Sequence, residues 1–310
     1  MAEVSVLMTV YNGMPYLPTA VKSILDQTLQ DLHFVIVNDG STDGTKEYLA
    51  SLDDDRIDVI HQENGGTAAA ANHGLSLVKT PYLARMDADD VAVANRLEIQ
   101  LKFLQENPDV GLVGGQVVPM GDHGEGRSLA LPLRHDAIDR CLMLGQHALA
   151  HSSLMMRTNV LNSIGGYWKH RLVDDVDMMI RMGEVSKLAN VSDVLLKYRV
   201  HANSVNGRGQ MRLHQSYQYA IKLAQLRRAG QPAITVEEFE AMQRDRNWFA
   251  QMGEKIHVHA ISQYRVGIAE IHGRRRLTGA FRIVWAMCCS PSRTLHRLTR
   301  IAKKKIGAVG

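Results

Sequence analysis

Three carboxylates fall within four positions at Asp87, Asp89 and Asp90, directly after the apolar run 82–86. Carboxylates this close repel one another and must be hydrated, paired with cations or bound to a metal. Oxygen ligands of this kind suit Mg²⁺ or Mn²⁺. The spacing alone favours a simpler interpretation, a hydrated turn in which an Asp caps the next helix. The position of the cluster in the fold must decide between the two.

A second acidic group, Asp174, Asp175 and Asp177, stands at the start of the helical pattern of residues 176–185. A carboxylate there can serve as a general base that removes a proton from an attacking hydroxyl. Acids are also favoured at helix N-termini by the helix dipole, and both interpretations can hold together. No spacing of His and Cys in the chain indicates a zinc site.

Apolar runs alternate with helical patterns through the first half of the chain. The runs predict strands at 4–10, 34–37, 57–60, 82–86 and 110–118, and the patterns predict helices at 16–28, 68–78 and 96–104. This order predicts right-handed βαβ units and a mostly parallel sheet with helices on both faces. Ligands bind beyond the carboxyl ends of such strands. We therefore expect four polar segments, 11–12, 38–41, 64–66 and 87–90, to gather at one edge of the sheet.

The overall composition excludes two classes of protein. Three cysteines in 310 residues do not form a disulfide framework, which favours a reducing, cytoplasmic setting. No run approaches the roughly 20 apolar residues of a membrane span, and the N-terminus lacks the basic region of a secretory signal.

The net charge of +4 conceals an asymmetry, because residues 271–310 carry ten Lys or Arg and no Asp or Glu. Residues 1–270 carry 26 basic and 32 acidic residues.

Eight segments occur in the order and at the spacing of one known family. They read SVLMTVYNGMPYLPTAVKSILDQT, FVIVNDGSTDGT, NGGTAAAANHGL, YLARMDADD, RLEIQLKFL, IGGY, VDDVDMMIRM and KYRVHANSVN. Together they resemble the family 2 glycosyltransferases, which have the GT-A fold, over roughly residues 3–205. The family often has two acids where this chain has Asn38-Asp39, a Pro in place of Ala94, and Glu-Asp in place of Asp174-Asp175. Residues 210–310 resemble no family that we can name.

The resemblance implies an inverting, metal-dependent hexosyltransferase that uses a nucleotide-diphospho-sugar, most simply a UDP-sugar. The acceptor would be a growing polysaccharide, lipopolysaccharide or lipid-linked glycan of the cell envelope. The cofactor would be Mn²⁺ or Mg²⁺, bridging carboxylate and phosphate oxygens. Two rivals remain. A nucleotidyltransferase shares the sheet and the metal-binding acid, and a catalytically inactive adaptor would bind glycans or membranes on the same scaffold. A Rossmann dehydrogenase is disfavoured because no Gly-x-Gly-x-x-Gly follows the first strand.

The same resemblance implies roles for single residues. Asp89 is the expected metal ligand, Asp87 contacts the ribose or shares the metal, and Asp90 supports them. Further expected donor contacts are Thr9, Tyr11 and Asp39 around the base, Gly40 in a tight turn, and His201 at the metal or diphosphate. Asp175 is the expected base, with Asp174 in support and His151 in the acceptor cleft. Arg85 has two equal interpretations, a partner of the diphosphate or neighbouring carboxylates, and a strand residue facing solvent.

The remainder of the chain predicts a helical extension. The loop 205–210 is the expected boundary between a catalytic domain, 1–209, and a helical, basic region, 210–310. Basic and apolar residues alternate at helical spacing in 271–310. This pattern predicts either attachment to an anionic membrane at its inner face, or a helix that packs its apolar side on the core and solvates its Lys and Arg. Nucleic-acid binding is a weaker third option, because no recognised module accompanies the charge.

Overall fold

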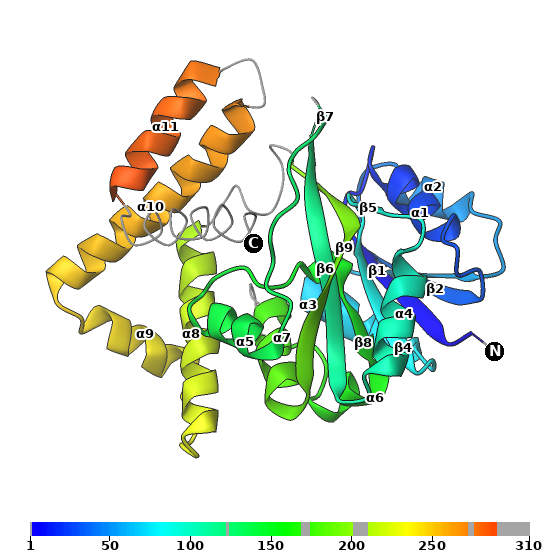
Figure 1. Cartoon of the computed structure of the whole chain (residues 1–310), viewed down its shortest axis with the longest axis horizontal. Coiled ribbons are helices and arrows are strands. Elements are labelled where there is room, and N and C mark those ends of the chain that lie inside the picture. The colour runs from blue at the N-terminus through cyan, green and yellow to red at the C-terminus, as the bar shows by residue number, and fades with distance from the viewer. Residues whose placement is uncertain (1, 122–123, 169–173, 201–209, 272–275, 290–310) are drawn as a thin grey trace, which may run out of the picture. The chain divides into compact units, whose positions relative to one another are not determined.

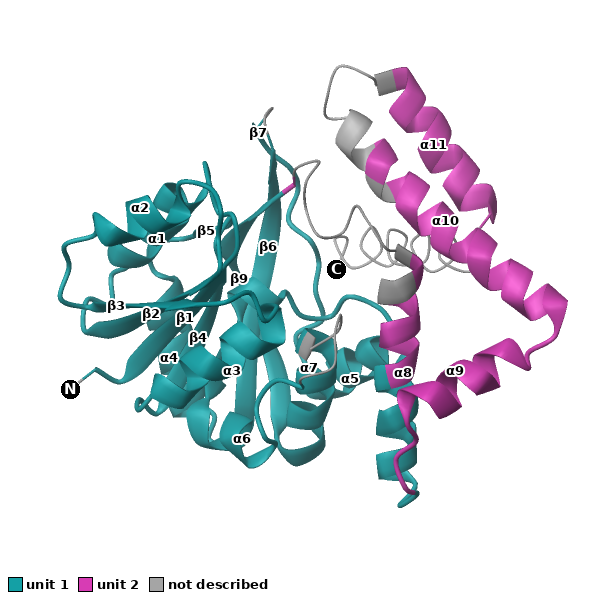
Figure 2. Ribbon diagram, turned by 180° about the vertical axis from the view of Figure 1, so that it is seen from behind, with its two compact units in different colours: residues 1–199, 220–231 teal, residues 200–219, 232–310 magenta. Residues whose placement is uncertain are grey.

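The computed structural model describes residues 2–121, 124–168, 174–200, 210–271 and 276–289 (Figure 1). The contacts between residues divide the chain into two compact units. The first comprises residues 1–199 and 220–231, and the second comprises residues 200–219 and 232–310 (Figure 2).

A nine-stranded sheet among the described residues forms the centre of the first unit. Its strands are β1 (Val4–Val10), β2 (Leu32–Asp39), β3 (Ile57–Gln62), β4 (Tyr82–Asp87), β5 (Val91–Ala92), β6 (Val110–Gly121), β7 (Gly124–Glu125), β8 (Met155–Arg157) and β9 (Lys187–Arg199). The order is β3-β2-β1-β4-β8-β6-β9-β5, and β7 pairs with β6. Strands β3, β2, β1 and β4 run parallel, as do β6 and β9. The predicted parallel βαβ half is therefore confirmed.

Helices cover both faces of this parallel half. The helices of the first unit are α1 (Leu17–Leu25), α2 (Thr45–Ala50), α3 (Thr67–Leu77), α4 (Arg96–Glu106), α5 (His135–Met143), the 3-10 turn η1 (His151–Ser153), α6 (Thr158–Ser163), α7 (Asp174–Val185) and the C-terminal part of α8 (Gln210–Arg228). Helices α1 and α4 share one buried apolar cluster with alternate residues of β1 and β4, including Met8 and Met86. Helix α3 packs on β1 and β2 from the other side. Because side chains alternate along a strand, Thr9, Arg85 and Asp87 all belong to the face that α3 covers.

The second half of the first unit differs from the sequence expectation. The helical pattern of residues 176–185 corresponds to α7, but the structure also contains β8, α6 and the long strand β9, which the sequence did not indicate. Strand β8 pairs antiparallel with both β4 and β6, so it interrupts the parallel order. A three-residue strand carries no periodicity of its own, and its place depends on the neighbours that it pairs with. Strand β2 also runs further than predicted, through Asn38 and Asp39.

Two fully buried side chains of α4, those of Arg96 and Gln100, form hydrogen bonds that connect α4 to β4, the strand that ends in the acidic cluster. Arg96 donates from Nη2 to the carbonyls of Arg85 (2.6 Å) and Leu154 (3.3 Å), and from Nε to Gln100 (3.0 Å). Gln100 donates in turn to the carbonyls of Val113 and Ser153. Burial lowers the pKa of Arg96 to about 10, opposed by the charges of Asp90 and Asp87, so the guanidinium remains charged at neutral pH. These bonds join α4 to β4, β6 and η1.

We expect Arg96→Met to lower the free energy of unfolding of the chain by about 3 kcal/mol or more, because buried carbonyls lose their donors. Denaturant unfolding measures this change. Lys102→Met is the matched control on the same helix, since Lys102 is exposed and pairs with the exposed Glu106. It should change stability by less than about 0.5 kcal/mol. Equal stability of the two variants would show that the buried guanidinium does not fasten β4.

The second unit is helical where it is described. It contains the N-terminal part of α8, α9 (Val236–Arg244), α10 (Trp248–Ile271) and α11 (Arg276–Cys289), as the helical patterns of the sequence predicted. Thr235 and Glu238 form a capping box at the start of α9. The ring of Tyr219 packs on Phe239, and its hydroxyl donates to the carbonyl of Ile234. Helices α10 and α11 pack together as a pair. None of the described helices combines the length and apolar character needed to cross a membrane.

Candidate functional site

The carboxyl ends of the first four strands meet at one edge of the sheet, as predicted. Thr9 at the end of β1 lies beside Asp87 at the end of β4. Asp39 at the end of β2 lies beside Gln62 at the end of β3. The polar segments that follow these strands are therefore neighbours in space although they span about eighty residues of sequence.

Asp39 is buried and holds the loop that follows β3. Its Oδ1 accepts hydrogen bonds from Gln62 Nε2 and Gly65 N, both at 2.8 Å, and its Oδ2 accepts one from Gly66 N at 2.9 Å. A carboxylate has about four acceptor positions, so one position on Oδ2 remains for a ligand N–H. Gly40 follows with φ +74°, and a Cβ there would lie 2.8 Å from Asn64 N. The tight turn expected at Gly40 is thus observed, and it brings the two loops together.

We expect Asp39→Asn to weaken the binding of UDP, the nucleotide implied by the resemblance, at least tenfold. One oxygen of Asp39 would become an NH₂ group, which cannot accept the hydrogen bonds that Asp39 now accepts. The Gly65-Gly66 loop would then lose part of its attachment. Calorimetric titration of UDP measures the effect. Asp58→Asn on the adjacent strand β3 is the control, because Asp58 is exposed. Unchanged affinity in Asp39→Asn would exclude Asp39 from the nucleotide site.

The loops after β1 and β2 are tied together by side chains whose roles we did not predict. Asn12 accepts from Thr42 N at 2.8 Å and donates from its own N to Ser41 Oγ at 2.9 Å. Two further backbone groups of the first loop donate to the side chains of Thr45 and Asp43. This loop carries Tyr11 with 54% of its surface exposed. Fastened in this way, an exposed aromatic ring can stack against a base.

The three carboxylates of the acidic cluster have different surroundings. Asp87 is partly exposed at the end of β4, whereas Asp90 is buried. Asp90 accepts hydrogen bonds from Ser152 Oγ and, at 2.8 Å, from Arg199 N, and Arg199 Nε donates to the carbonyl of Asp89 at 2.7 Å. Burial and the negative charges of Asp87 and Asp89 raise the pKa of Asp90 to about 8, against the effect of its hydrogen bonds. Asp90 therefore connects this turn to η1 and β9.

The accessible carboxylates of Asp87 and Asp89 fit a hard divalent cation. Their charge already bears on Asp90, and a cation would relieve that repulsion. Among the described residues, no group of three or more His, Cys, Asp or Glu side chains is arranged to hold a metal ion. A diphosphate supplies oxygen ligands of its own, so few protein ligands are needed. His201, the other expected ligand, lies outside the described residues.

Arg85 is buried, with 2% of its surface exposed, so the interpretation as a solvent-facing residue is wrong. Its guanidinium donates to the carbonyl of Leu7 at 3.1 Å and to Thr9 Oγ1 at 3.3 Å, and its Nη2 lies 3.9 Å from Asp87 Oδ1. Its Nε has no hydrogen-bond partner among the described residues. The alternative that pairs Arg85 with a neighbouring carboxylate agrees with this geometry. Arg85 thus places a fixed positive charge directly beneath the acidic cluster.

His151 belongs to the same cluster as Arg85 and Asp87. Its Nδ1 lies 3.9 Å from Asp87 Oδ1, its Nε2 lies 3.3 Å from the Tyr167 hydroxyl, and the His151 and Tyr167 rings meet edge to face. Burial, with a contribution from the charge of Arg85, holds the pKa of His151 well below its usual range. We expected His151 in an acceptor cleft, and the structure places it, as a neutral ring, against Asp87.

The motif IGGY positions Tyr167, a site residue that we did not single out. Gly165 and Gly166 have φ +80° and +71°, and a Cβ on Gly166 would lie 2.7 Å from Asn72 Oδ1. The side chain of Asn72 on α3 bonds both the N–H and the carbonyl of Tyr167. The guanidinium of Arg85 lies 5.6 Å from the centre of the Tyr167 ring. The two glycines thus turn the chain so that Tyr167 packs beneath the acidic cluster.

The acids of α7 divide into two kinds. Asp175, in the first turn of α7, accepts a hydrogen bond from Val176 N at 2.8 Å. Asp177 is buried and bonds Arg181, which donates to the carbonyls of Ile164 and Gly166. Asp177 therefore stabilises the IGGY turn. The side chain of Asp174 lies outside the described residues.

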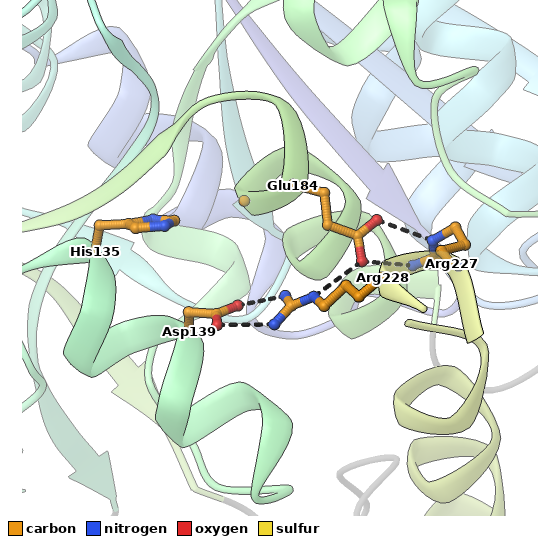
Figure 3. A pocket seen from close by; sticks show the side chains of 6 residues that line it. His135, Asp139, Glu184, Arg227 and Arg228 are labelled. Atoms are coloured by element: carbon orange, nitrogen blue, oxygen red, sulfur yellow. Dashed lines mark hydrogen bonds and ion pairs between the residues drawn. The ribbon is translucent and has the colours of Figure 1, made fainter. Parts of the chain in front are cut away.

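A pocket of about 420 Å³ lies elsewhere in the first unit and includes no predicted site residue (Figure 3). It is lined by His135, Asp139, Gly183, Glu184, Arg227 and Arg228. Arg228 binds Asp139 through two parallel hydrogen bonds, and Arg227 binds Glu184 at 2.9 Å. The two guanidinium groups are thus paired with carboxylates from α5 and α7. These pairs fasten the end of α8.

Several named relatives align with about two-thirds of the chain. An uncharacterized glycosyltransferase of Haemophilus influenzae is 29% identical over 223 residues, 66% of this chain and 67% of the relative. The amylovoran biosynthesis glycosyltransferase AmsE of Erwinia amylovora is 29% identical over 66% of this chain and 79% of its own. The O-antigen biosynthesis glycosyltransferase WbnJ of Escherichia coli is 30% identical over 65% of this chain and 81% of its own.

Solved structures share the fold at low sequence identity. S. aureus TarS 1–349 in complex with UDP-GlcNAc superposes with a TM-score of 0.61, at 14% identity over 97% of this chain and 92% of that one. The mannosyltransferase PcManGT from Pyrobaculum calidifontis, in complex with GDP-Man and Mn²⁺, gives 0.55 at 16% identity, over 99% and 81% of the two chains. The predicted GT-A fold is confirmed. The model of the glycosyl transferase family 2 matches residues 5–165. The chain belongs to glycosyl transferase family 2.

Proposed function

We propose that this glycosyltransferase is an inverting, metal-dependent enzyme that transfers a hexose from a UDP-sugar to a hydroxyl of a saccharide or lipid-linked glycan. One observation carries the proposal: the loops held by Asp39 and the carboxylates of Asp87 and Asp89 lie at the same edge of a parallel sheet. A nucleoside bound beside Asp39, with its diphosphate beside Asp87 and Asp89, would match this arrangement.

The donor end of the site would use Asp39 and Tyr11. The free acceptor position of Asp39 suits an N–H of uracil, and the exposed Tyr11 ring suits stacking on the base. Thr9 already accepts from Arg85, so its hydroxyl can still donate to the nucleoside. The structure of TarS with UDP-GlcNAc supports a UDP-sugar, whereas PcManGT is described with GDP-Man. The uracil proposal rests on Asp39 and is open to a direct test.

The metal would be held by Asp89, with Asp87 shared between the metal and the ribose and His201 as a further contact. When bound, Mn²⁺ or Mg²⁺ supplies charge neutralisation for the leaving diphosphate. Arg85 Nη2 and His151 Nδ1 each lie 3.9 Å from Oδ1 of Asp87, so a guanidinium and an imidazole ring stand next to this carboxylate.

Asp175 would act as the base that takes the proton from the acceptor hydroxyl as that oxygen attacks the anomeric carbon. Attack on the face away from the leaving group inverts the configuration. Asp174 would support this carboxylate. The turn that carries IGGY is fastened to the same helix through Asp177 and Arg181, which limits movement of α7 relative to the acidic cluster.

The named relatives support a polysaccharide acceptor. AmsE and WbnJ are named for amylovoran and O-antigen biosynthesis, and both align over about two-thirds of this chain. We propose an acceptor of the same chemical class, a saccharide that is being extended in the synthesis of a cell-envelope glycan.

Hydrolysis of a panel of UDP- and GDP-sugars with Mn²⁺ tests the proposed donor. We expect slow release of UDP from one or a few UDP-sugars and none from GDP-sugars. Preferential hydrolysis of a GDP-sugar would contradict the role of Asp39 in uracil recognition. Release of pyrophosphate from a nucleoside triphosphate with a sugar phosphate would instead identify a nucleotidyltransferase.

A further inference from the structure

The outward side of α11 is apolar and uncharged. Leu277 and Phe281 have 90% and 73% of their surfaces exposed. The exposed residues between positions 277 and 288 are Leu277, Thr278, Ala280, Phe281, Val284, Trp285, Met287 and Cys288, and none is charged. A helix that faces water normally presents charged or polar residues on its outer side. This side of α11 is therefore suited to contact with another apolar phase.

The inward side of α11 contains its packing contacts and its charge. Ala286 is buried, and Trp285, which is at the edge of the outward side with 37% of its surface exposed, also meets the ring of His259 of α10 edge to face. The guanidinium of Arg282 donates to Gln263 of α10. The sequence supports two expectations for this region. In one of them, a helix packs its apolar side on the core and exposes its Lys and Arg side chains to solvent. In the described part of α11 the side toward α10 is apolar at Ala286 and includes Arg282, but the exposed side is apolar too and does not present solvated Lys and Arg.

We propose that the apolar side of α11 docks on an anionic lipid bilayer. Residues 271–310 carry ten Lys or Arg and no Asp or Glu, so the charges of this segment are attracted to acidic headgroups. The same charge disfavours a second copy of the chain, since two such segments repel each other. Aromatic and aliphatic side chains beside basic residues are the composition of helices that lie in the membrane interface. This inference goes beyond the proposed transfer reaction and does not depend on it.

Co-sedimentation of the full chain with vesicles tests the proposal. We expect binding to phosphatidylglycerol–phosphatidylcholine vesicles, at least tenfold weaker binding to phosphatidylcholine alone, and loss of the difference at high salt. Phe281→Glu should weaken binding to the anionic vesicles at least tenfold, because it places a charge on the side of α11 that would enter the bilayer. Leu144→Glu is the control, since Leu144 is an exposed apolar residue of the first unit, with 61% of its surface accessible.

Two results would overturn the proposal. In one, Phe281→Glu and the unchanged chain bind anionic vesicles equally. In the other, the chain sediments as a dimer that Phe281→Glu converts to a monomer, which would show that a second copy covers α11. UDP titration of both variants confirms that the first unit is folded. If the unchanged chain does not bind UDP, the proposed donor is contradicted. The vesicle result would still test the membrane proposal separately.

Discussion

Replacing Asp175 with Asn is expected to lower the rate of sugar transfer about 10³-fold and to leave the affinity for UDP within about twofold of the original. The amide cannot accept the proton of the acceptor hydroxyl, and a positioned general base contributes roughly 10²–10⁴-fold. Asp175 accepts a backbone hydrogen bond within the first turn of α7, and the amide oxygen of Asn can accept the same bond. The helix should therefore be retained while the chemistry is lost.

Steady-state transfer to a saccharide acceptor and calorimetric titration of UDP separate the two effects. Asp193→Asn, at an exposed position of β9, is the control and should leave both unchanged. A large loss of UDP affinity in Asp175→Asn would mean that Asp175 belongs to the donor site. Full transfer activity in this variant would assign the base to another residue.

Asp89→Asn is expected to abolish most of the gain in UDP affinity that Mn²⁺ provides, which is a loss of about tenfold in the presence of the metal. A neutral amide is a poor ligand for a hard cation compared with a carboxylate. The backbone carbonyl of Asp89 accepts from Arg199, and this bond does not need the side chain, so the turn should persist.

Asp55→Asn is the matched control for Asp89→Asn. Asp55 is an exposed acid in the sequence Asp53-Asp54-Asp55, which precedes β3 and so lies at the opposite end of the parallel strands. It should leave the effect of Mn²⁺ unchanged. An equal gain from Mn²⁺ in Asp89→Asn and in the unchanged chain would contradict the assignment of Asp89 as the metal ligand.

The parts of the fold that the sequence predicts are those with strong local signals. Strands β1 and β4 are buried on both faces and read as nearly continuous apolar runs, and the helices between the strands are periodic. Parallel pairing then places Asp39 and Asp87 at one edge without further information. The resemblance adds roles that spacing alone does not supply, because an isolated Asp-x-Asp also fits a hydrated turn.

The remaining features depend on contacts between distant segments. Whether Arg85 faces water depends on Tyr167 and His151, which arrive from elsewhere in the chain to cover it. The burial of Arg96 depends likewise on two carbonyl groups from elsewhere in the chain, those of Arg85 and Leu154. Asp177 resembles its neighbours in sequence, yet its partner Arg181 and the turn beyond it make it structural. No periodicity reports such pairings, so they require the folded structure.

Calorimetric titration of the unchanged chain with UDP, in the presence and absence of Mn²⁺, tests the central proposal most directly. The proposed site predicts binding of one UDP per chain that is at least tenfold tighter with Mn²⁺, because Asp87 and Asp89 otherwise face the diphosphate as like charges. Equal affinity with and without the metal, or no binding of UDP, would contradict the assignment of these carboxylates to a metal-assisted donor site.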